Sequence, residues 1–143
     1  MRTKLTVAAC ALALASLTTA VRAADDLVSG LVGEYFALEE APGDFPNLPK
    51  TKKPYYVRVE KTVDFDDSPE DFHGIKLSDN FFARWTGVLR AEKAGSYTFF
   101  TDSDDGSRLI INGKTVVDNG GVHGMQEASG KVDLTAGDHE IRI

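Results

Sequence analysis

The sequence predicts an all-β domain, built as an antiparallel β-sandwich or barrel. Short runs in which apolar and polar residues alternate recur between Gly, Asp, Asn and Pro residues, as in proteins made of short strands. After the first residues, no long window repeats apolar side chains at the 3.6-residue spacing of a helix. Asn112 and Gly113 separate two apolar runs, which is a strong signal of a β-hairpin. Strands at this spacing typically close into a sandwich or a barrel.

The strands are expected where β-branched and aromatic residues gather between turn-forming segments. Three prolines make residues 41–53 an irregular surface loop, and Asp, Pro and Gly residues make 66–78 an acidic loop. Asp, Asn and Gly residues also separate the later runs. We expect strands at residues 30–38, 55–65, 80–90, 96–101, 108–111, 114–117, 131–134 and 139–143.

Two connections predict tight hairpins. Asn112 and Gly113 tolerate the positive φ that a two-residue loop needs, so the strands on either side of them should pair. Residues 135–138 predict a second hairpin, between the runs 131–134 and 139–143. Both faces of residues 108–117 are rather apolar, which favours an interior place in a sheet for the first hairpin.

Residues 1–23 have the pattern of a secretory signal peptide. A basic start through Lys4 precedes an apolar run, and Val21 and Ala23 offer small residues at a cleavage site. The apolar run is shorter than the roughly 20 residues that span a bilayer, so a membrane span is not expected. We expect export to the periplasm or the extracellular space. Cys10, the only cysteine, would leave with the signal, so the mature chain would have no disulfide.

The remaining chain, residues 24–143, fits one domain of roughly 120 residues. Its last predicted strand stops at Ile143 without a following turn, so we expect a C-terminally truncated domain. The net charge of −6 argues against nucleic acid as a partner and is compatible with cation binding. No nucleophile and base stand in a recognisable context, so an enzyme is not expected.

The stretch from Asp102 to Gly106 holds three aspartates before a glycine, and turn chemistry alone accounts for such a segment. A metal site is the alternative. An EF-hand is excluded, because that loop needs Gly at its sixth position and Glu at its twelfth, where this chain has Ser107 and Gly113. Two adjacent carboxylates are also poor partners for glycoside hydrolysis, which needs them about 5–10 Å apart across the scissile bond.

Several short motifs occur together and in a characteristic order. In this order they resemble the protective-antigen domain family, the lectin-like β-sandwich module named from the anthrax protective antigen. The resemblance covers residues 30–143. The motifs are GLVGEYF at 30–36, FARWTG at 82–87, SDDGSRL at 103–109, ING at 111–113, VDN at 117–119, LTAG at 134–137 and IRI at 141–143.

The resemblance implies an exported, non-catalytic carbohydrate-binding module of the kind found in secreted glycosidases, adhesins and toxins. Sugar-binding members hold a calcium ion on two adjacent aspartates joined by a cis peptide, and the matching positions are Asp104 and Asp105. Calcium prefers hard oxygen ligands such as carboxylates, and sugar hydroxyls can replace its water. Calcium is thus the expected cofactor and a cell-surface glycan the expected partner. The alternative is a structural or protein-interaction accessory domain of a larger exported enzyme or surface protein.

The chain departs from the family pattern in two places. In sugar-binding relatives a second loop completes the ion site, and it would follow Ile143. Many relatives also carry an aromatic residue after the Asp-Asn pair, where this chain has Gly120 and Gly121. For the pair itself, Asp118 and Asn119, either a ligand-binding role beside the ion or simple turn chemistry remains open.

The other candidate residues favour structural interpretations. The carboxylates at 66, 67, 70 and 71 with His73 indicate a solvated loop rather than a metal site. His123 and His139 have no neighbouring serine that would make a nucleophile relay. Trp85 stands within an apolar run and is expected in the core rather than as a platform for a sugar.

Overall fold

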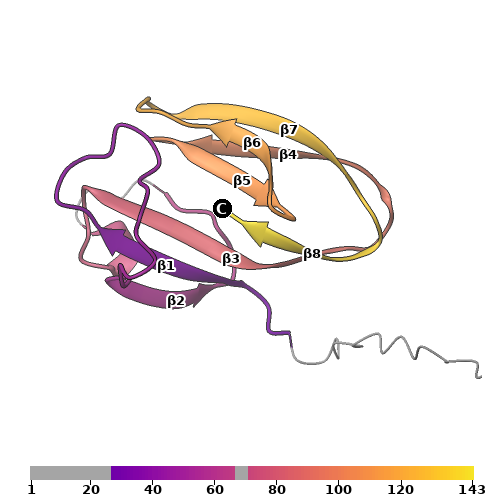
Figure 1. Ribbon diagram of the computed structural model, residues 1–143, viewed down its shortest axis with the longest axis horizontal. Helices are drawn as coiled ribbons and strands as arrows, with labels where there is room; N and C mark the ends of the chain where they lie inside the picture. Colours follow the sequence, from indigo (N-terminus) through magenta and orange to yellow (C-terminus); the bar gives the residue numbers. More distant parts are fainter. Residues whose placement is uncertain (1–26, 67–70) are drawn as a thin grey trace, which may run out of the picture.

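The computed structural model describes residues 27–66 and 71–143 (Figure 1). The expected signal peptide and two members of the acidic loop, Asp67 and Glu70, lie outside these ranges. Within them the chain forms strands and one short 3₁₀ helix, and no helix there is long and apolar enough to cross a membrane. The elements are β1 (Leu31–Ala37), β2 (Tyr56–Glu60), η2 (Phe72–Gly74), β3 (Phe81–Ala91), β4 (Gly95–Ser103), β5 (Ser107–Ile111), β6 (Lys114–Asn119), β7 (Gln126–Leu134) and β8 (Gly137–Arg142).

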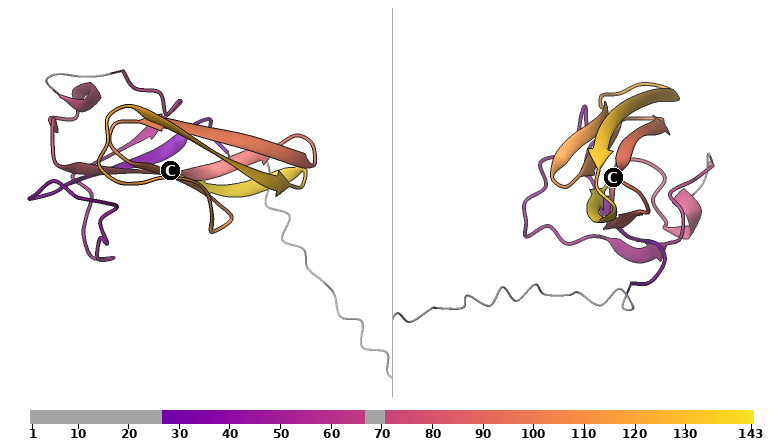
Figure 2. Two further views of the ribbon diagram at one scale, coloured as in Figure 1. Left: turned by 90° about the horizontal axis from the view of Figure 1, so that it is seen from above. Right: turned by 90° about the vertical axis from the view of Figure 1, so that its right-hand side faces the viewer.

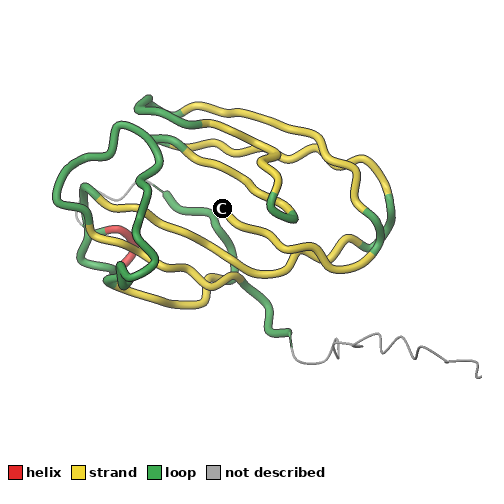
Figure 3. Tube along the Cα trace, viewed as in Figure 1, coloured by secondary structure: helices red, strands yellow, loops and turns green. Residues whose placement is uncertain are grey.

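The strands form two antiparallel sheets, which confirms the predicted all-β sandwich. The larger sheet has the order β2-β1-β3-β8-β5-β6, and β4 pairs with β7 in a second sheet (Figures 1 and 3). Alternate side chains of β4 and β7 pack on the β5–β6 end of the larger sheet. The buried cluster between the layers consists of Ala91, Leu109, Ile111, Val117 and Leu134.

At its other end the larger sheet is covered by loops instead of strands. Tyr35 and Phe36 are adjacent in β1, point to opposite faces, and are 0% and 2% exposed. Phe72 of η2 lies against Tyr35 at a ring-centroid distance of 5.8 Å, whereas Phe36 lines a cavity together with Leu48 and Pro49 of the loop after β1. The loop after β1 and the segment carrying η2 therefore stand on opposite sides of the sheet (Figure 2).

The hairpin predicted at Asn112 and Gly113 is confirmed. Both residues have positive φ, 49° and 76°, and Ile111 pairs with Lys114. The side chain of Asn112 also ties this turn to β8, because its Oδ1 accepts a hydrogen bond from the backbone N–H of Glu140 at 3.0 Å. The turn is thus fixed by backbone conformation and by a contact with a neighbouring strand.

The second predicted hairpin, at residues 135–138, is wrong. β7 pairs with β4, whereas β8 pairs with β3 and β5, so this connection crosses from one sheet to the other. The reason is that Leu134 and His139 both face the space between the layers, and a crossover places them on opposite walls of that space. Gly137 makes the change of direction with a φ of +123°.

Two smaller expectations also need correction. The interior position predicted for residues 108–117 holds for β5 but not for β6, which is an edge strand of the larger sheet. The strand predicted at 55–65 is shorter, because β2 ends at Glu60. The chain then turns back over the sheet and stacks Phe65 on Trp85 at a centroid distance of 5.7 Å.

Candidate functional site

Asp104 and Asp105 occupy the connection between β4 and β5. β4 ends at Ser103 and β5 begins at Ser107, so the two aspartates form the turn itself. Both side chains are exposed to solvent, and the peptide bond between them is cis, as the family resemblance implies. Two carboxylates thus stand side by side at one end of the sandwich. The neighbouring Asp102 belongs to β4, where it lies opposite Glu127.

His123, in the loop after β6, contacts the acidic turn. Its backbone N–H donates a hydrogen bond to Asp105 Oδ1 at 3.1 Å. Its ring nitrogens lie next to two carbonyl oxygens, Gly124 O at 2.9 Å from Nδ1 and Asn119 O at 3.2 Å from Nε2. These hydrogen bonds raise the pKa of His123, and the charges of Asp105 and Asp104 raise it further. Asp105 is therefore held by a backbone donor beside a histidine that favours its charged form.

Gly106 allows the acidic turn and the loop after β6 to touch backbone against backbone. A Cβ atom at this position would lie 2.8 Å from Gly121 O and 3.1 Å from Asn119 O. Such distances are too short for any side chain, so the close approach requires glycine here. This contact, together with the hydrogen bond from His123, fixes the position of Asp105 relative to the loop.

Asn119 lies beneath the turn and is 2% exposed. Its Nδ2 is 2.8 Å from Gln126 O and 3.3 Å from Ser103 Oγ, and its Oδ1 accepts a hydrogen bond from Gln126 Nε2 at 2.9 Å. Ser103 Oγ in turn bonds Ser107 Oγ at 2.7 Å. The carboxamide of Asn119 therefore joins the end of β4 to the start of β7, directly below the acidic turn. Its direct role in ligand binding stays a prediction.

Asp118 is exposed and pairs with Arg108 across β5 and β6. Both of its carboxylate oxygens accept hydrogen bonds from Arg108 Nη2, at 2.9 and 3.0 Å. The same guanidinium lies over the ring of Phe45, 4.2 Å from its centroid. The carboxylate of Asp118 is thus paired with Arg108 of the neighbouring strand β5. Its expected ligand-binding role is still a prediction.

Phe45 supplies an aromatic ring that the sequence motifs did not indicate. The ring comes from the loop after β1 and lies close to Gly120. A Cβ atom added to Gly120 would be 3.2 Å from Cε2 of Phe45. Gly120 is one of the two positions where the family resemblance leads one to expect an aromatic residue. The chain therefore places a ring at this point from a distant segment. No local pattern around residues 41–53 could have predicted this contact.

The aspartate pair offers donor atoms of the kind that calcium binds. Two exposed carboxylates offer hard anionic oxygens of the kind that calcium prefers. Within the described ranges, no group of three or more His, Cys, Asp and Glu side chains gathers in one place. Asp104 and Asp105 therefore fit calcium in kind, while further ligands would come from carbonyl oxygens, water or sugar hydroxyls.

The remaining candidates have structural partners. His73 Nε2 lies 2.9 Å from Asp66 O, and its ring packs against Phe65 at 5.0 Å. His139 is buried, with Nδ1 beside Asn112 Nδ2 and Nε2 beside Thr135 O, both at 2.9 Å. Trp85 is half-buried, and its Nε1 donates a hydrogen bond to the hydroxyl of Tyr35 at 3.3 Å. These contacts agree with the structural interpretations of the two histidines, whereas Trp85 is not part of the buried core that was expected for it.

Comparison with known proteins gives a consistent family. The family described as the PA14 domain matches residues 27–143. A curated relative, the anti-sigma-I factor RsgI3 of Acetivibrio thermocellus, is 31% identical over 112 residues, which cover 76% of this chain and 15% of the relative. The chain thus spans only a small part of that relative's length.

Two solved structures are similar over most of the chain. An anti-sigma factor domain-containing protein is 27% identical with a TM-score of 0.65, and the match covers 80% of this chain and 37% of that protein. A PA14 sugar-binding domain from an RTX adhesin is 25% identical with a TM-score of 0.62, and the match covers 82% of each chain.

Proposed function

Since the chain belongs to the PA14 domain family, we propose that it is a non-catalytic carbohydrate-binding module of an exported protein and that it binds sugar with the help of calcium. This family is the protective-antigen family expected from the sequence motifs. The proposal assigns the ion to Asp104 and Asp105 and the sugar to the surface around them.

The observation that carries the proposal is the placement of the two aspartates. They are exposed at the end of the sandwich, in the β4–β5 connection, and one of them is held by the backbone N–H of His123. A similar solved domain, matched over 82% of both chains, is named as a sugar-binding domain of an adhesin. The shared fold, together with the two exposed carboxylates that this chain holds in a fixed turn, supports a sugar as the ligand.

The residues of the chain have separate tasks in this proposal. Asp104 and Asp105 supply the anionic oxygens, and bound calcium would supply a positive centre that accepts sugar hydroxyls. The N–H of His123 orients Asp105, and Asn119 holds the strands below the turn at a fixed spacing. Phe45 lies beside Gly120 in the loop after β6, where its aromatic ring offers an apolar surface to the C–H face of a sugar.

A glycan array tests this proposal. The full chain is applied with calcium and again with a chelator, beside the variant Asp104→Asn and the control Asp102→Asn. We expect binding to a subset of glycans that disappears with chelator and in Asp104→Asn but persists in the control. Equal binding under all four conditions would contradict a role for the aspartate pair.

A second candidate is a structural or protein-interaction accessory domain. It is supported by the relatives in which this domain is one part of an anti-sigma factor protein, 15% of the curated relative and 37% of the solved one. In that case the acidic turn would serve the fold alone. A glycan array without any binding, together with Asp104→Asn and wild-type chains that unfold alike with and without calcium, would favour this candidate.

A further inference from the structure

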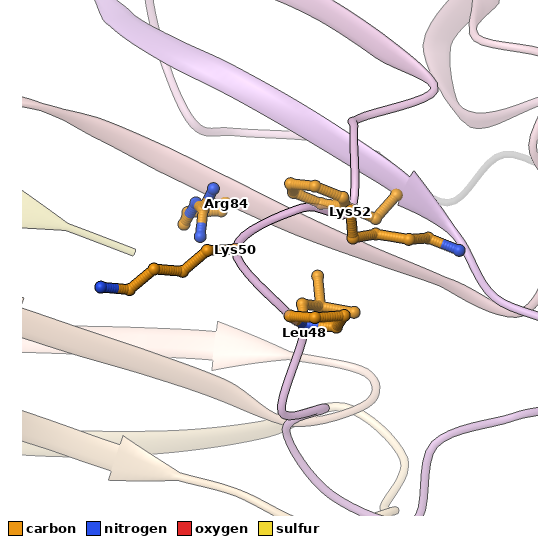
Figure 4. Close-up of a pocket in the computed structure, with 6 residues that line it drawn as sticks. Leu48, Lys50, Lys52 and Arg84 are labelled. Atoms are coloured by element: carbon orange, nitrogen blue, oxygen red, sulfur yellow. The ribbon is translucent and has the colours of Figure 1, made fainter.

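A cavity of about 210 Å³ lies away from the acidic turn, between the loop after β1 and the strands β1 and β3 (Figure 4). Phe36 and Arg84 line it from the sheet. The loop contributes two apolar and two basic residues, Leu48, Pro49, Lys50 and Lys52. The cavity is smaller than the about 300–1,000 Å³ of pockets for drug-sized ligands, so it would take a single ring rather than a long chain.

The loop that forms this cavity is held at both ends and in the middle. Leu38 N donates to Asn80 O at 2.7 Å where the loop begins, and Tyr55 N donates to Tyr35 O at 2.7 Å where it ends. The ring of Phe45 is fixed under the guanidinium of Arg108. Within the loop, a hydrogen bond of 2.9 Å from Lys52 N to Pro49 O closes a turn. The cavity therefore exists before any ligand arrives.

The cavity is positively charged in a protein whose net charge is −6. All three ionisable residues that line it are cations. Arg84 forms an ion pair with Glu34: its Nε donates a hydrogen bond to Glu34 Oε2 at 2.8 Å, and its Nη2 lies 2.8 Å from the same oxygen. No ion pair within the described ranges involves Lys50 or Lys52. Their side chains leave the loop in opposite directions, and their Nζ atoms lie at the two outer ends of the group of lining residues (Figure 4).

The walls combine this charge with apolar surface. Phe36 is 2% exposed, and the guanidinium of Arg84 lies over its ring at 5.2 Å from the centroid. Leu48 and Pro49 line the cavity from the loop. A ligand that suits these walls has one anionic group for the cations and one apolar face. A sugar ring with a carboxylate has both, since its axial C–H groups form an apolar face.

We propose that this cavity binds the carboxylate of an acidic saccharide, with a uronic acid as the simplest example. The choice of a saccharide rests on the proposed carbohydrate-binding function, whereas the choice of an anion rests on Lys50, Lys52 and Arg84. The site is separate from Asp104 and Asp105 and needs no calcium. It would make the domain selective for glycans that carry carboxylates.

Nuclear magnetic resonance of the full chain tests this proposal with defined probes. Glucuronate is titrated into the ¹⁵N-labelled protein and compared with glucose, which lacks the carboxylate, and with inorganic phosphate, which lacks the ring. We expect glucuronate to shift the amide signals of residues 48 and 50–52 and the Nε–H of Arg84, and glucose and phosphate to shift them much less. Equal shifts with phosphate would reduce the site to a general anion site and overturn the proposal.

Matched charge variants separate the cavity from the general charge of the surface. All four lysines compared are exposed: Lys50→Gln with Lys52→Gln removes two cations that line the cavity, and Lys53→Gln with Lys61→Gln removes two that do not. We expect the first pair to weaken glucuronate binding about fivefold, as for exposed ion pairs, and the second pair to leave it within twofold. Equal weakening in both pairs would overturn the proposal.

Measuring glucuronate binding with calcium and with a chelator separates a failure of the cavity proposal from a failure of the proposed calcium-dependent function. We expect the same glucuronate affinity with calcium, with chelator and in Asp104→Asn, because the cavity does not use the aspartate pair. An affinity for glucuronate that vanishes with chelator would place the carboxylate at the acidic turn and contradict the cavity site. The test does not depend on whether the aspartate pair binds calcium.

Discussion

The backbone N–H of His123 donates a hydrogen bond to Asp105 Oδ1 at 3.1 Å, and so ties the loop after β6 to the acidic turn between β4 and β5. The two segments are separated by a whole hairpin in sequence. Their contact brings a histidine ring and two carboxylates to one end of the sandwich. The acidic turn is thus a joint feature of two loops rather than of one motif.

His123 should titrate above its ordinary pKa. Its ring nitrogens lie beside Gly124 O and Asn119 O, and Asp105 and Asp104 add attraction for the charged ring. Because the pKa is raised on folding, the resulting stabilisation is complete below the unfolded-state pKa of about 6.5 and is lost as the pH rises through the higher folded-state pKa. A proton NMR titration of the His123 ring measures this midpoint. A midpoint at or below the ordinary value would contradict these contacts, and added calcium should lower it by repulsion.

Gly106→Ala should destabilise the domain by about 1–3 kcal/mol, because the new methyl group would meet the backbone of Gly121. The control is Gly124→Ala, since a Cβ there meets nothing within 4 Å. Denaturant unfolding of both variants measures the difference. If the two variants lost the same stability, the close approach of the two loops would be disproved.

Asn119→Ala should lower the free energy of unfolding by about 1–3 kcal/mol, because it removes the hydrogen bonds that the buried carboxamide makes to Gln126. Asn47→Ala serves as the control, since Asn47 is exposed. Thermal melting of the two variants without calcium checks this. A stable Asn119→Ala variant that had lost only glycan binding would instead support a direct ligand role for Asn119.

Tyr35 should ionise at a higher pH than an ordinary tyrosine. Burial, and then its hydrogen bond to Glu60, raise the pKa of Tyr35 to about 12. Stability from this group is therefore complete below about pH 10 and falls as the pH rises through the folded-state value. The near-ultraviolet absorbance of phenolate gives the titration, with Tyr35→Phe to identify the late component. Loss of an early component in that variant would contradict the burial of Tyr35.

Local signals in the sequence predicted the elements whose conformation is decided locally. Asn112 and Gly113 determine their hairpin by backbone preference, and the acidic turn falls where Asp104 to Gly106 predict it. The bounds of β1 and β3 lie within one residue of those expected, because apolar and aromatic alternation ends sharply at both. Four of the seven family motifs, at 30–36, 82–87, 103–109 and 111–113, lie in these same elements.

Pairing between distant segments could not be predicted in this way. Alternation shows that Leu134 and Ile141 face a core, but it does not show which sheet each strand joins, so the crossover at Gly137 was missed. The ring of Phe45 beside Gly120 and the burial of Asn119 also depend on the packing of separate loops. Such contacts follow from the tertiary arrangement and leave no local pattern.

The central claim is that Asp104 and Asp105 bind calcium in the folded domain. Thermal melting with calcium and with chelator tests it directly, using Asp104→Asn with Asp105→Asn against the control Asp102→Asn. A ligand that binds only the folded state raises the melting temperature. We predict that calcium raises it for the wild type and the control and leaves the double variant unchanged. An identical melting temperature for the wild type with calcium and with chelator would contradict the claim.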